Sequence, residues 1–227
     1  MNILVRAYSS SLGKKYIMAI SGFALFLFVI AHMAGNLQIF LGREAINAYA
    51  EFLKSKPGLL WSARAGLLIL VILHITAAIQ LVSENNDARP VKYEEGRPTA
   101  ASLASRTIFV SGLVIFAFVI YHLLHFTFGV TNPEFLTAKD PGDPLRHDVY
   151  GMMINGFSNP WVSAFYIISM GLLCLHLSHG VSSAFQSLGI RNKGNVRAIH
   201  RTARIAALVI FVGNCAIVLA VLLRWVR

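Results

Sequence analysis

The chain has 227 residues, of which 56% are hydrophobic and only 13% are charged, and its formal net charge is +10. This composition excludes an ordinary soluble domain of the same length and is typical of an integral membrane protein. Because the lysines and arginines lie mainly between apolar runs, the positive charge does not indicate nucleic-acid binding; it suits an anionic membrane surface or an acidic protein partner.

Five apolar stretches are long enough to cross a bilayer, which takes about 20 residues. Each is too long for a strand and shows no strict alternation, so we expect five helices. The predicted spans are residues 16–41, 60–82, 107–130, 160–188 and 205–225. The first span is long enough to be retained rather than cleaved as a signal peptide. The sequence therefore predicts an all-α integral membrane protein with one domain, residues 1–227.

Two of the connections between the spans are expected to have structure of their own. In residues 43–57 the apolar side chains recur at helical spacing, which predicts a short amphipathic helix along the outer interface. Residues 131–159 are rich in proline, glycine and aspartate, which predicts an ordered outer cap or loop. No stretch indicates a second, soluble domain.

Basic residues are distributed unequally between the two ends of the predicted spans. On one side the connection between the fourth and fifth spans contains five basic residues and no acid. On the other side Glu44, Glu51, Glu134, Asp140, Asp143 and Asp148 dilute the positive charge. The positive-inside rule then places the N-terminus in the cytoplasm and the C-terminus outside. The basic residues of the cytoplasmic side are Arg6, Lys14, Lys15, Arg89, Lys92, Arg97, Arg106, Arg191, Lys193, Arg197, Arg201 and Arg204.

Each of the first four spans contains a histidine that is a candidate metal ligand: His32, His74, His122 and His176. A buried imidazole is costly in hydrocarbon unless its nitrogens are satisfied. Each histidine lies past the midpoint of its span, and successive spans run in opposite directions. His32 and His122 should therefore share an outer level, and His74 and His176 an inner level roughly 10 Å away. Two pairs at two depths are what two stacked bis-histidine haems require, held by a bundle of four helices.

The residues alone leave alternatives open. His125 and His179, three residues after His122 and His176, could be the ligands instead. Zinc usually takes three or four close ligands, among them carboxylates or thiolates. A proton relay in a membrane usually recruits Asp or Glu, and the interiors of these spans contain neither. No CxxCH stretch marks covalent haem attachment, so any haem should be of the b type.

The first and third spans echo each other. In both, a Ser-Gly dipeptide is followed by nine residues and then by the histidine: Ser21-Gly22 before His32, and Ser111-Gly112 before His122. Eleven residues make about three helical turns, so serine and histidine share a face. We therefore expect the two helices to face one shared object, and the two glycines to lie where the inner haem passes.

Short motifs along nearly the whole chain resemble one known family. They are SLGKK near the start, ISGFA leading to His32, NAYAEF in residues 47–52, LHI around His74, VSGL leading to His122, and HLSHG from His176 to Gly180, followed by Gly189. In this pattern the chain is similar to the single-chain, five-helix, di-haem cytochrome b membrane anchor of succinate:quinone oxidoreductase and fumarate reductase.

The resemblance implies roles for individual residues. A glycine four residues after the ligand selects His176 over His179, and the spacing from Ser-Gly selects His122 over His125. His74 and His176 would then bind the inner haem b, and His32 and His122 the outer one, with Ser21, Ser111 and Gly180 in the cofactor sites. Glu51 would be a weak candidate for the quinone site. His125 and His179 would serve haem propionates, quinone or contacts between helices.

The resemblance also implies partners and a location. A flavoprotein subunit and an iron–sulfur subunit would bind on the cytoplasmic face, at the basic residues from Arg191 to Arg204 and at Lys14-Lys15. The chain would carry electrons between the iron–sulfur subunit and menaquinone in the inner membrane of a prokaryote, with no dicarboxylate chemistry of its own. The rival hypotheses are another di-haem membrane cytochrome, such as a cytochrome b561-like or hydrogenase-type subunit, and a haem-free transporter or structural protein.

Overall fold

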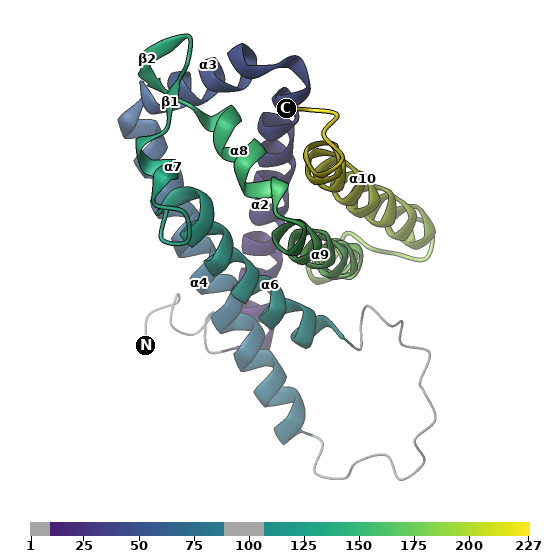
Figure 1. The fold of residues 1–227 in the computed structure, drawn as a ribbon. Coiled ribbons are helices and arrows are strands. Elements are labelled where there is room, and N and C mark those ends of the chain that lie inside the picture. Colours follow the sequence, from purple (N-terminus) through teal and green to yellow (C-terminus); the bar gives the residue numbers. More distant parts are fainter. Residues whose placement is uncertain (1–9, 89–106) are drawn as a thin grey trace.

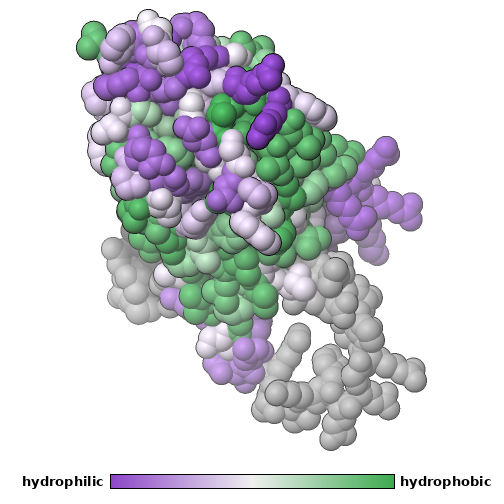
Figure 2. Space-filling view, in the orientation of Figure 1, coloured by the Kyte–Doolittle hydropathy of each residue, from purple (hydrophilic) through white to green (hydrophobic). Residues whose placement is uncertain are grey.

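The computed structural model describes residues 10–88 and 107–227, and helices dominate it (Figure 1). Five helices are long and apolar enough to cross a membrane. They are α2 (Ser11–Asn36), α4 (Pro57–Asp87), α6 (Ile108–His122), α9 (Pro160–Ser187) and α10 (Val196–Leu222). Figure 2 shows apolar surface over the middle of the molecule and hydrophilic residues gathered at the end that carries α3, β1 and β2. The prediction of a helical chain with five helices that could span a membrane is confirmed at this level.

Several helix ends differ from the predicted spans. Helix α2 begins at Ser11, where the side chain of Ser10 accepts a hydrogen bond from the amide of Gly13 (3.0 Å), and it continues into η1 (Leu37–Leu41). Helix α10 begins at Val196 instead of residue 205, so the basic residues 197–204 belong to the helix and not to a loop. Arginine is a good helix former, which explains the extension. Arg6, Arg89, Lys92, Arg97 and Arg106 lie outside the described residues.

The helices pack unevenly. Helix α2 packs against α4 and α9, α9 also packs against α6, and α10 lies along α9 (Figure 1). Within residues 10–88 and 107–227, α4 makes no extensive backbone contact with α6 or α9, and α2 makes none with α6. An apolar cluster of Phe26, Met33, Leu177, Ala207 and Ile210 joins α2, α9 and α10. The two hairpin-like units, α2 with α4 and α6 with α9, are therefore held together chiefly through α9.

The connections expected on the outer side form a structured cap. Helix α3 (Arg43–Lys54) occupies the predicted amphipathic segment. After α6 the chain makes a π-helical turn, η2 (Leu123–Thr127). It then forms α7 (Glu134–Thr137), the antiparallel hairpin of β1 (Lys139–Asp140) and β2 (Asp143–His147), and α8 (Val149–Ser158). Residues 131–159 thus fold as short elements over the ends of the spanning helices.

A buried polar cluster ties the cap together. The side-chain amide of Asn47 in α3 donates to Asp140 (2.9 Å) and to Asp148 (3.0 Å), and its oxygen accepts from the amide of Tyr150 (2.9 Å). Arg146 bonds Asp140 (2.6 Å), which links β2 to β1. The hydrogen bonds from Asn47 and from the amide of residue 142, together with the Arg146 guanidinium, lower the pKa of Asp140 to about 2.

Candidate metal-ligating histidine pairs

The four histidines meet in two pairs. The rings of His32 in α2 and His122 in α6 have centroids 5.8 Å apart and are nearly perpendicular, at 87°. The rings of His74 in α4 and His176 in α9 lie 6.4 Å apart at 68°. These are the pairs that helix direction predicts. Each pair joins two helices that make no extensive backbone contact within the described ranges.

The spacing of each pair fits two imidazoles on opposite sides of one metal ion. An imidazole nitrogen binds a metal at about 2.0–2.1 Å and lies ~1.1 Å from the ring centre, so two such rings should have centroids roughly 6.3 Å apart. The observed 5.8 Å and 6.4 Å lie on either side of that value. In the described part of the chain no three His, Cys, Asp or Glu side chains gather as a metal site, so the set does not fit structural zinc.

The inner histidine of α4 is oriented by α2. Nδ1 of His74 lies 3.3 Å from the hydroxyl of Ser21 and 3.2 Å from the carbonyl oxygen of Met18. The Ser21 hydroxyl donates its own proton to the carbonyl of Ile17 (2.6 Å), so toward the imidazole it acts as an acceptor. Both neighbours therefore favour a proton on Nδ1, which leaves the lone pair of Nε2 for a metal.

The inner histidine of α9 has the same arrangement with α6. Nδ1 of His176 lies 3.3 Å from the hydroxyl of Ser111, which donates to the carbonyl of Ile108 (3.0 Å). The serine of each Ser-Gly dipeptide therefore contacts the inner histidine of the neighbouring helix and not the histidine of its own helix. Ser21 and Ser111, expected in the cofactor sites, hold the imidazoles themselves. The two helical units therefore make the same kind of Ser–His contact, in addition to having the same Ser-Gly spacing in sequence.

The glycines of the echo allow the inner rings to approach the neighbouring helices. A β-carbon at Gly22 would lie 2.8 Å from Cε1 of His74, and one at Gly112 would lie 3.4 Å from Cε1 of His176. At Gly180 no described atom comes within 4 Å of such a β-carbon, so that face of α9 is open to a bulky group. Gly22 and Gly112, expected where the inner haem would pass, thus lie against the imidazoles of His74 and His176.

The same contacts give the distance between the two levels. Gly22 marks the inner level on α2, ten residues before His32, and Gly112 marks it on α6, ten residues before His122. At 1.5 Å per residue both helices place the pairs about 15 Å apart along the bundle. The sequence had suggested roughly 10 Å, because the depths were counted from the predicted span ends and not from contacts between the helices.

His125 and His179 do not face a partner histidine. His125 is 1% exposed, and its Nδ1 lies 3.1 Å from the hydroxyl of Tyr166. Nε2 of His179 lies 3.1 Å from the hydroxyl of Ser183, one turn along α9. Among the described residues, histidine rings stack or pack edge-on with one another only in the two pairs above. Tyr166 was not a sequence candidate, because a tyrosine in an aromatic-rich apolar run gives no signal of its own.

The weaker candidates lie at the two surfaces. Glu51 is exposed on α3, and its carboxylate lies 4.0 Å from Arg146, at the edge of the cap's ion pairs. Lys14 forms an ion pair with Glu84 at the end of α4, and Ser11 also donates to that carboxylate (2.8 Å). Lys14 therefore ties α2 to α4 and contributes little free charge to a docking surface.

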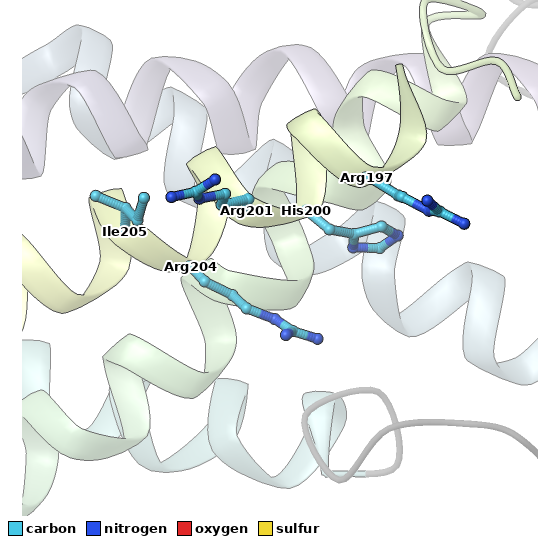
Figure 3. Close-up of a pocket in the computed structure, with 5 residues that line it drawn as sticks. All are labelled: Arg197, His200, Arg201, Arg204 and Ile205. Atoms are coloured by element: carbon cyan, nitrogen blue, oxygen red, sulfur yellow. The ribbon is translucent and has the colours of Figure 1, made fainter. Parts of the chain in front are cut away.

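The start of α10 forms a basic hollow of about 620 Å³. Figure 3 shows Arg197, His200 and Arg204 projecting from one side of the helix, and Arg201 and Ile205 complete the lining. Nδ1 of His200 lies 2.9 Å from the hydroxyl of Ser182 in α9. The arginines that line the hollow form no ion pair with any described carboxylate, so the hollow keeps its positive charge.

No protein-family model matches the chain, and neither curated proteins nor solved structures give a match. The family resemblance therefore rests on the motifs quoted from the sequence.

Proposed function

We propose that the chain is the di-haem cytochrome b membrane anchor of a succinate:quinone oxidoreductase or fumarate reductase. The observation that carries the proposal is the arrangement of the histidines: two facing pairs, about 15 Å apart along the bundle, each drawn from two apolar helices. The two pairs would each hold one haem b, which when bound supplies reversible one-electron transfer.

The chain's own residues prepare the ligand atoms. In the inner pair Ser21 and Ser111 accept the Nδ1 protons of His74 and His176, so that Nε2 of each ring is free to bind iron. In the outer pair the hydroxyl of Tyr166, 3.3 Å away, faces Nδ1 of His122. The polarity of the surroundings of a haem is one of the protein's means of setting its potential, and both pairs come from apolar helices.

The proposed electron path runs between an iron–sulfur subunit on the cytoplasmic face, joined to a flavoprotein, and a quinone in the membrane. The uncompensated arginines of the hollow at the start of α10 support a docking surface for an acidic partner on that face. Menaquinone is the proposed quinone and the inner membrane of a prokaryote the proposed location, both from the family resemblance.

The test is to purify the chain with an affinity tag from its native membrane. The proposal predicts co-purification of a flavin-containing and an iron–sulfur subunit, succinate:quinone reductase activity in the complex, and a b-type α-band in the reduced-minus-oxidised spectrum. Haem without these two partners would favour another di-haem membrane cytochrome. Absence of the α-band from folded protein would favour a transporter or structural protein.

A further inference from the structure

One hydroxyl bridges two histidines at the outer level. The Oη atom of Tyr166 lies 3.3 Å from Nδ1 of His122 and 3.1 Å from Nδ1 of His125. Tyr166 is 5% exposed and His125 is 1% exposed. Water is therefore a poor substitute for either contact, and each polar atom depends on the protein for its partner.

The direction of this bridge follows from the chemistry of a ligating imidazole. If Nε2 of His122 binds iron, its proton is on Nδ1, which donates to Oη of Tyr166. The single proton of the tyrosine hydroxyl is then left for His125. Nδ1 of His125 must accept it, which places the His125 proton on Nε2. The three side chains thus form one directed chain of hydrogen bonds, from His122 through Tyr166 to His125.

Aromatic packing holds these three hydrogen-bonded side chains in position. Aromatic rings pack around Tyr166 with centroids 5.0–6.3 Å away: Phe118, Tyr121, Phe126, Phe157 and Phe165. His125 packs on Phe126 at 4.1 Å and on Phe135 of α7 at 5.6 Å. It lies in the π-helical turn η2, and Gly156 of α8 lets α8 approach it: a β-carbon there would lie 3.1 Å from Cε1 of His125. Hydrogen bonds in such an apolar setting are stronger than in water.

The two levels differ in the group that accepts the Nδ1 proton of the histidine. At the inner level the acceptors are serine hydroxyls whose protons go to backbone carbonyls within the same helix. At the outer level the acceptor is a phenol whose proton goes to a second imidazole, anchored in the cap. Accepting the Nδ1 proton of a ligating imidazole makes that imidazole more electron-donating and favours ferric over ferrous iron.

We propose that Tyr166 is a positioning residue for the outer haem: with His125 as its own acceptor, it orients His122 and lowers the midpoint potential of that haem. This inference rests on the proposed function, since it concerns the ligand of a haem. Among the described residues neither Tyr166 nor His125 contacts His74 or His176, so the potential of the inner haem should not change.

The test is a potentiometric titration of both haems in the purified complex, with the α-band as readout. In Tyr166→Phe we expect two haems per chain, an upward shift of one midpoint potential and an unchanged second potential. Tyr121→Phe is the matched control: its ring lies in the same aromatic cluster, and no hydrogen bond of its hydroxyl occurs among the described residues. It should leave both potentials unchanged.

A second pair of variants tests His125, the last acceptor in this series of hydrogen bonds. His125→Asn keeps an acceptor near the position of Nδ1 and should preserve the outer potential, whereas His125→Leu removes the acceptor and should shift the potential upward. If Tyr166→Phe loses the outer haem, the outer midpoint potentials of His125→Asn and His125→Leu are compared instead. A higher potential in His125→Leu than in His125→Asn supports the inference. Unchanged potentials in both Tyr166→Phe and His125→Leu, with both haems bound, would overturn the inference and leave the proposed function standing. Wild-type protein without haem would overturn both.

Discussion

Replacing Gly22 by alanine should weaken the inner haem selectively. The added β-carbon would lie 2.8 Å from Cε1 and 3.1 Å from Nδ1 of His74. Carbon atoms are at their optimal separation at about 3.5–4.0 Å, so the ring must retreat by about 0.7 Å or more. His74 cannot retreat without lengthening its hydrogen bonds to Ser21 and Met18, which hold its ligand geometry.

The expected loss can be set against the gain in helix stability. Alanine is favoured over glycine inside a helix by about 0.8–1.0 kcal/mol, so the fold itself should not suffer. Disturbing the contacts that orient a metal ligand typically costs 10–100-fold in affinity, and we expect a loss of that order for the inner haem, about 1.4–2.8 kcal/mol.

Competition for haem measures this directly. Wild-type and variant protein in detergent are mixed with an excess of apomyoglobin, and haem transfer is followed by absorption. Gly22→Ala should release one of its two haems faster or further than the wild type. The matched control is Gly112→Ala, where the new β-carbon would lie at an ordinary 3.4 Å from Cε1 of His176. Equal haem retention in both variants and the wild type would refute the steric argument.

Two predictions concern the inner histidine pair and one concerns the cap. His176→Ala should reduce the haem content from two to one per chain, whereas His179→Ala should leave two, because only His176 faces His74; quantification as the pyridine haemochrome separates the cases. Ser111→Ala should raise the inner midpoint potential in a redox titration and leave the outer one, since it removes the side-chain acceptor of the Nδ1 proton. Because the cap lowers the pKa of Asp140 from an ordinary 3.8 to about 2, its stabilising effect is complete above about pH 4 and is lost as the pH falls toward 2. Melting temperatures measured across that range should drop in the wild type and change less in Asp140→Asn; equal pH profiles would contradict this role.

The sequence predicted the features that depend on local composition. Apolar runs of about 20 residues marked all five spanning helices, and their alternating direction sorted the histidines into the pairs that the structure brings together. The start of α10 was missed because Arg197, Arg201 and Arg204 interrupt the apolar run without interrupting the helix.

Contacts between distant segments could not be read from the sequence. Asn47 bonds Asp140 and Asp148, which lie 93 and 101 residues away, and an asparagine in an amphipathic helix gives no sign of such partners. The Ser-Gly echo indicated a shared face, but only the packing of α2 on α4 shows that Ser21 contacts His74. The hydroxyl of Tyr166 contacts His125, which lies in the π-helical turn η2, and no local residue pattern predicted that turn.

The haem content of the purified chain shows whether the two histidine pairs bind haem. The protein is expressed with haem available, purified in detergent, and assayed for haem b and for protein by amino-acid analysis. We expect two haems per chain in the wild type, and one when either His32 or His74 is replaced by alanine. A folded wild-type protein that binds no haem, or that keeps both haems after loss of His74, would contradict it.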